Sequence, residues 1–145
     1  MTSLKIKTPY LDMEFKPQEA DKNAAWDLYI ELLTRVATQE LNNCDGDELA
    51  ALESVQSIFP ITRSIIKDNG RECKEFAKVA VVILNQRIRP FTSKWHKLTL
   101  NEELNFKEKK KEFRGDLKEL QKDLKVYTAM LADLAGVEDL TDLEG

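Results

Sequence analysis

The chain has 145 residues, of which 42% are hydrophobic and 33% charged, and its formal net charge is −4. This length fits a single domain, and the hydrophobic fraction is high enough to form a core, which argues against a globally disordered chain. The acidic balance, with a sequence pI near 5.2, counts against broad nucleic-acid binding, because nucleic-acid-binding domains are usually strongly basic. Only five glycines and four prolines occur, and this shortage of turn residues favours long helices over an all-β fold.

Residues 1–16 are predicted to form an extended N-terminal arm. Apolar side chains alternate loosely between Leu4 and Phe15, with Pro9 between them. This pattern is typical of a short strand or of an extended segment lying on the rest of the protein. A single strand would have no partner to pair with, so both interpretations stay open.

The chain is expected to be cytoplasmic and to make no contact with a membrane. Lys5 and Asp12 interrupt the N-terminal segment before it could serve as the apolar region of a signal peptide. The longest apolar run, 79–84, is far shorter than the ~20 residues that span a bilayer. Cys44 and Cys73 lack the spacing of a zinc site or redox pair, so two reduced thiols are expected.

Residues 17–136 are predicted to form a helical domain whose first helix runs from about Pro17 to Leu41. Apolar side chains recur there at helical spacing and form a broad buried face: Ala25, Trp26, Leu28, Tyr29, Leu32, Leu33 and Val36. The residues at 42–46 favour turns and should end this helix.

A second helix is predicted to begin at a cap formed by Asp45 or Asp47. Pro60 falls inside its apolar pattern and should kink or split it near Ile58, because proline removes one backbone donor and clashes with the preceding turn. Gly70 should stop it, since glycine readily takes the left-handed conformation found just after helices.

A third helix, from about Arg71, carries the most apolar segment of the chain. A strand is the alternative for 79–84, which is rich in valine and isoleucine. Helix-forming residues on both sides favour a helix, and only neighbours on all sides would cover its apolar surface. This helix is therefore predicted to be the central one. Pro90 disfavours helical geometry at Arg89, so the helix should end or bend there.

The fourth helix has the clearest pattern. From Phe113 onward, apolar residues follow a repeating four-three spacing that is typical of bundles and coiled coils; with Phe106 added, the set is Phe106, Phe113, Leu117, Leu120, Leu124, Tyr127, Leu131 and Leu134. Gly136 should close the helix in a Schellman motif with Val137. This seam is expected to pack inside its own domain, so a monomer is favoured over a homodimer.

These elements predict an all-α fold, a four- to five-helix bundle with a short extended N-terminal arm and an acidic tail at 137–145. The candidate site is a basic stretch within 76–101, which contains no Asp or Glu. Its second half interleaves cations with aromatic residues, and the predicted partner- or anion-binding residues are Arg87, Arg89, Phe91, Lys94, Trp95, His96 and Lys97.

Three roles are open for this stretch. The acidic tail could fold back on it in an internal clasp, with no function in binding. A protein partner could dock on it, because arginine and tryptophan often anchor interfaces. Alternatively, arginine forks and stacked aromatic rings could bind a phosphate, a nucleotide or single-stranded nucleic acid.

No constellation of residues predicts an enzyme. The only histidine, His96, has no acidic residue near it in the sequence, and it forms no metal site with the two separated cysteines. Asp27 and Glu31 share a helix face and could be read as a general acid/base pair, but amphipathic helices routinely carry such pairs of carboxylates. No phosphate-binding or hydrolase motif occurs. We therefore predict a non-enzymatic interaction module without cofactor or metal, which binds a protein partner, or alternatively a nucleotide or nucleic acid, through the basic stretch.

Overall fold

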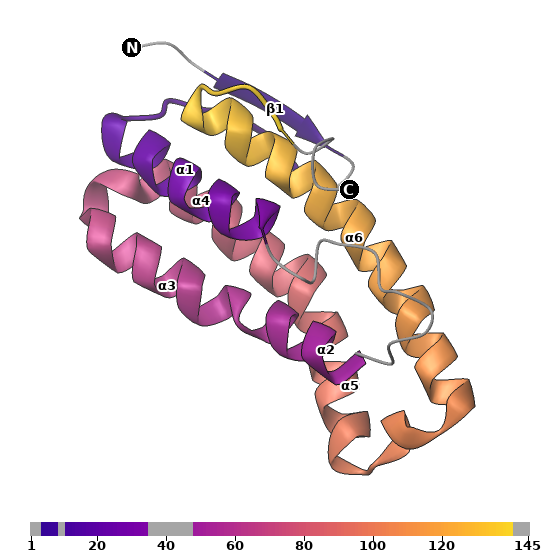
Figure 1. Ribbon diagram of the computed structural model, residues 1–145. Helices are drawn as coiled ribbons and strands as arrows, with labels where there is room; N and C mark the ends of the chain where they lie inside the picture. The colour runs from indigo at the N-terminus through magenta and orange to yellow at the C-terminus, as the bar shows by residue number, and fades with distance from the viewer. Residues whose placement is uncertain (1–3, 9–10, 35–47, 141–145) are drawn as a thin grey trace.

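The computed structural model describes residues 4–8, 11–34 and 48–140, which form a mainly helical protein with one β-hairpin (Figure 1). The elements are β1 (Leu4–Thr8), β2 (Leu11–Phe15), α1 (Glu19–Leu33), α2 (Glu48–Gln56), α3 (Ile58–Asn69), α4 (Lys74–Ile83), α5 (Arg89–Leu100) and α6 (Lys107–Ala135). The predicted helical class is confirmed. The count of four to five helices is not, because the described residues form six α-helical segments. None of these helices is both long enough and apolar enough to cross a membrane.

The N-terminal segment is extended, and it contains two strands instead of one. β1 and β2 pair antiparallel, with Leu4 opposite Phe15 and Thr8 opposite Leu11. The strand that was expected to lack a partner therefore finds one in the residues that immediately follow it. Figure 1 shows the hairpin beside the C-terminal half of α6, which β1 contacts, at the end of the molecule opposite the α5–α6 turn.

The central helix is α1, not the third predicted helix. α1 packs against α3, α4 and α6, and one face of it is fully buried: Asp21, Ala24, Ala25, Leu28, Tyr29 and Leu32. α4 buries one face, which includes Phe76 and Ile83, while Val81 on the other face is 48% exposed. The prediction that other helices surround α4 is therefore wrong. The apolar run does not need to be covered on every side, because a single exposed apolar side chain such as Val81 is common on a protein surface.

A buried carboxylate fixes α1 against α4. Asp21 lies at the start of α1, where its Oδ2 accepts the Gln18 N–H at 2.8 Å in a capping box. Its Oδ1 accepts the Phe76 N–H at 2.9 Å, at the start of α4. One side chain therefore satisfies backbone donors at two helix N-termini, where a negative charge is also favoured by the helix dipole.

The predicted helix boundaries are met in part. α1 ends at Leu33, well before Leu41, and the predicted turn at 42–46 with its capping residues Asp45 and Asp47 lies outside the described residues. The second predicted helix is split just before Ile58, into α2 and α3, as expected upstream of a proline. Gly70 ends α3 with a φ of 72°, as predicted.

Helical structure does not end at Arg89. Leu84–Ile88 forms a π-helical turn that joins α4 to α5, and the Arg89 N–H donates to the Leu84 carbonyl. Pro90 explains this wider turn, because its ring has no N–H and would collide with a carbonyl placed one regular turn earlier. The chain therefore passes the proline as a helix.

α6 confirms most of its predicted pattern. The seam from Phe113 to Leu134 is buried within the single chain, whereas Phe106, just before the helix, is 63% exposed. At the other end the Val137 N–H donates to the Ala132 carbonyl at 3.0 Å, and the Gly136 N–H donates to Asp133 at 3.1 Å. This is the hydrogen-bond pattern of the predicted Schellman motif.

Candidate functional site

The basic stretch is divided between the core and the surface. Phe91 and Trp95 are only 7% and 0% exposed, Arg87 is half-buried, and the other four predicted residues are exposed: Arg89, Lys94, His96 and Lys97. Residues four apart lie on one face of a helix, and this face of α5 is turned toward α6. Phe91 and Trp95 therefore cannot offer an external stacking surface, and this part of the prediction is corrected.

The two buried aromatic rings attach α5 to α6. The Trp95 ring meets Phe113 edge-on, with 5.1 Å between ring centroids. Phe91 contacts the same phenylalanine at 5.4 Å. Such tilted aromatic pairs stabilise a core beyond the area that they bury.

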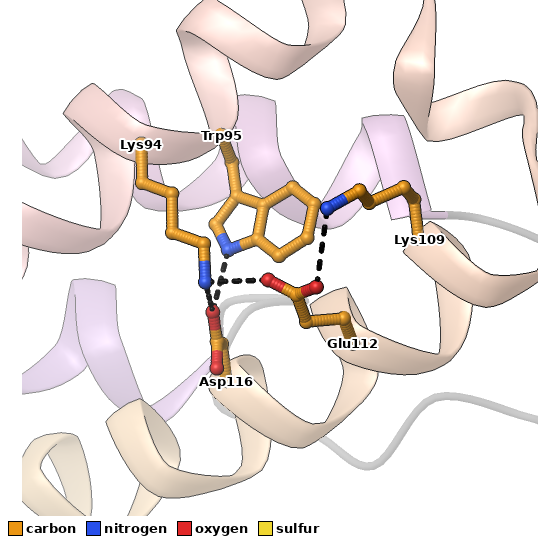
Figure 2. A network of polar contacts seen from close by, with 5 residues as sticks. All are labelled: Lys94, Trp95, Lys109, Glu112 and Asp116. Carbon is orange, nitrogen blue, oxygen red and sulfur yellow. Dashed lines mark hydrogen bonds and ion pairs between the residues drawn. The ribbon is translucent and has the colours of Figure 1, made fainter.

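A network of polar contacts lies beside the Trp95 ring, as Figure 2 shows. The Trp95 Nε1–H donates to Asp116 Oδ2 at 3.0 Å. Lys94 Nζ lies 2.7 Å from the same oxygen and 2.7 Å from Glu112 Oε2. Lys109 adds a further ion pair to Glu112 at 3.3 Å. Lys94 is therefore held between two carboxylates of α6.

The pKa values of this network reflect the pairing. The hydrogen bonds that Lys94 donates to Asp116 and then to Glu112 raise the pKa of Lys94 above its ordinary value. Hydrogen bonds from Lys94 and then Lys109 lower the pKa of Glu112. The positive charge of Lys94 is therefore neutralised by two carboxylates, and an incoming phosphate would have to compete with both of them for the ammonium group.

The acidic tail does not supply these partners in the part that the structure describes. Tyr29 of α1 donates its hydroxyl hydrogen to the Glu138 carbonyl at 3.4 Å and accepts the N–H of Leu140. Residues 141–145 lie outside the described range. The internal clasp of Lys94 is thus formed by α6, and the described start of the tail lies against α1.

One further cation of the stretch has contacts of its own. The Arg89 guanidinium lies 4.7 Å from the centre of the Phe59 ring, and its Nε–H donates to Asn85 at 3.3 Å.

A groove of about 290 Å³ lies between α5 and α6. Its lining residues are Arg87, Pro90, Phe91, Lys94, Asp116, Glu119, Leu120 and Asp123. Because this groove contains both signs of charge, it has no clear preference for an anion.

A larger groove, of about 440 Å³, lies between α1 and α3; we call it the Trp26 groove. Its lining residues are Trp26, Asp27, Ile30, Glu31, Ile61, Ser64 and Ile65. Figure 1 shows α1 and α3 side by side on one flank of the molecule. Trp26 is 43% exposed and leans on Tyr29, with 6.0 Å between ring centroids. The groove therefore presents a large aromatic surface to solvent.

The sequence contains the signal for this groove, although it was interpreted as core. Trp26, Ile30 and Leu33 recur at a spacing of four and three, one residue beyond the buried stripe of α1. A second apolar stripe beside the first widens the apolar face past what α3 covers. Ile30 and Leu33 are half-buried, and Trp26, nearest the start of the helix, is exposed.

Groups suited to metal binding or covalent chemistry are scarce in the described part of the chain. No cluster of three or more His, Cys, Asp or Glu side chains there could hold a metal ion. Cys73 is a buried free thiol, and its burial and then the charge of Asp21 raise its pKa. A thiol with a raised pKa is a poor nucleophile.

No protein-family model matches the chain, and comparisons with curated proteins and with solved structures find no similar protein.

Proposed function

We propose that this protein is a small, non-enzymatic interaction module that binds a protein partner through the Trp26 groove. The observation that carries the proposal is the 43% exposure of Trp26 over a groove that Ile30, Ile61 and Ile65 also line. Tryptophan is among the residues that contribute most to protein–protein binding. Exposed apolar surface gathered in one hollow is typical of interaction sites.

The groove is also built on rigid elements. Trp26, Ile30 and Ile61 project from two helices that pack on each other, and Ile30 and Ile61 also pack against the core. Side chains held in this way lose little conformational entropy when a partner docks on them. We therefore expect the groove to bind without a large rearrangement.

The basic stretch has a secondary place in this proposal. Its exposed residues outside the α6 clasp, Arg89, His96 and Lys97, could extend the interface or contact a second region of the partner. The alternative of nucleotide or nucleic-acid binding has less support, because Phe91 and Trp95 are buried and Lys94 is paired with Glu112 and Asp116.

Crosslinking from the groove would test the proposal. A photoreactive phenylalanine analogue placed at Ser64, which lines the groove and is exposed, should give specific adducts in an extract of the native host. The substitution Trp26→Ser should abolish these adducts. Val81→Ser is the matched control, since Val81 is 48% exposed and lies outside the groove. Adducts that persist in Trp26→Ser would contradict the proposal.

A further inference from the structure

We propose that the occupant of the Trp26 groove is a cationic amphipathic helix, that is, a segment with lysine or arginine side chains flanking an apolar anchor. This inference rests on the proposed function and adds the chemistry of the partner. Three observations carry it: the charge of the groove, the state of its carboxylates and the geometry of its walls.

The described lining of the groove has one sign of charge. Among the residues that the structure describes, Asp27 and Glu31 are the charged ones that line it, and none of the lining residues is a lysine, arginine or histidine. The groove between α5 and α6, by contrast, has Arg87 and Lys94 among its acids. An aromatic and aliphatic floor with carboxylates on its α1 side is complementary to an apolar side chain flanked by cations.

Asp27 is available to such a cation. Within residues 4–8, 11–34 and 48–140 it makes no hydrogen bond or ion pair, and it is exposed. Glu31 lies one helical turn further along the same face of α1, is half-buried and already has an interaction of its own. A cation on a partner helix could therefore face Asp27 directly, and a second cation one turn along would share Glu31 with the group that it already contacts.

The walls favour a helix over an extended peptide. Trp26 to Ile30 and Ile61 to Ile65 have backbone N–H and C=O groups that are used within or at the end of α1 and α3. An extended peptide would find no backbone partner there, whereas a helix satisfies its own hydrogen bonds. Each wall is five or six residues long, or ~8 Å at a rise of 1.5 Å per residue. The occupant therefore needs one apolar anchor and about two turns.

Fluorescence anisotropy with labelled peptides tests this inference directly. The probe is an amphipathic peptide of leucine and lysine, ~18 residues long so that a helix can form in solution. Two matched peptides replace every lysine with glutamine or with glutamate. The protein variants are Trp26→Ala, the double substitution Asp27→Asn with Glu31→Gln, and a control double substitution, Glu53→Gln with Asp133→Asn. The control removes two exposed carboxylates outside the groove, so the change in net charge is the same.

We expect the lysine peptide to bind and the glutamate peptide not to bind. Trp26→Ala should weaken binding at least about tenfold, as for an interface anchor. The groove double substitution should weaken it about fivefold or more, since two surface ion pairs are lost. The control should change binding less than about twofold. Raising the salt from ~0.15 M to ~1 M should weaken the lysine peptide and leave little difference between groove and control variants.

Two results would overturn the inference. If the glutamine peptide bound as tightly as the lysine peptide and still required Trp26, the groove would be an apolar docking site without charge selection; the proposed function would then stand. If no peptide bound in a Trp26-dependent manner, a cationic helix would be the wrong occupant. The crosslinking experiment at Ser64, which assumes nothing about charge, would then decide the proposed function separately.

Discussion

The two tryptophans of this protein have opposite environments. Trp95 is fully buried, packs edge-on against Phe113 and donates its indole N–H to Asp116. Trp26 is 43% exposed, and no hydrogen bond involves its indole in the described part of the chain. The difference shows that the position of a residue relative to the apolar stripe of its helix decides its burial, whereas the charges beside it in the sequence do not.

The largest expected effect is on stability. Trp95→Ala should lower the free energy of unfolding by about 3–5 kcal/mol, because it removes a large buried ring and leaves a cavity. Trp26→Ala should change it by less than about 1 kcal/mol, since much of that ring is already in water. Urea unfolding of both variants measures the difference. Equal losses would mean that the two environments are not distinct.

A second pair of substitutions compares the carboxylates beside the two rings. Asp116→Ala should cost about 1–3 kcal/mol, because the buried indole N–H of Trp95 and the Lys94 ammonium both lose an acceptor. Asp27→Ala should stay within about 0.5 kcal/mol. Both residues lie inside α-helices, so the difference in helix propensity between Asp and Ala cancels in the comparison. A loss in Asp27→Ala that matched the loss in Asp116→Ala would show that Asp27 has a structural partner.

The smallest expected effect concerns pH. Pairing with Lys94 lowers the pKa of Glu112 below its ordinary value of 4.5, so the pair stabilises the protein above that pH. The stabilisation is lost as the pH falls through the lowered pKa. Because the pKa of Lys94 is raised above 10.5, its contribution is complete below that value and is lost as the pH rises through the raised pKa.

Lys94→Met should therefore reduce the fall in melting temperature between about pH 5.5 and about pH 3. Lys122→Met is the control, because it removes an exposed lysine of α6 that pairs with Glu119 and takes no part in the contacts drawn in Figure 2. If wild type and Lys94→Met lost the same amount across this range, the network in Figure 2 would not contribute to acid stability.

Local features of the sequence predicted much of the helical framework. The seam of α6, the split upstream of Pro60, and the helix ends at Gly70 and Gly136 were all predicted, because each depends on a residue and its near neighbours. The β-hairpin was missed for a related reason. A strand was considered at Leu4–Phe15, but its partner within the same short segment was not.

The candidate site was harder to predict, since it depends on tertiary contacts. The sequence neighbours of Trp95 are Lys94 and His96, which made the ring appear exposed, whereas its environment is decided by Phe113 and Asp116 in another helix. Trp26 was counted with the core because it lies within helical spacing of buried residues. Its place in a second stripe beside the buried one indicated a wide apolar face, but how much of that face α3 covers depends on tertiary packing.

The carboxylate of Asp21 has a consequence for how the helices form. The Phe76 N–H, at the start of α4, donates to a side chain that is 55 residues away in the chain. The first turn of α4 is thus completed only when α1 is in place, so the two helix starts should open and close as one cooperative unit. Hydrogen exchange at the single amide of Phe76 would then report how often α1 and α4 separate, even though that amide belongs to only one of them.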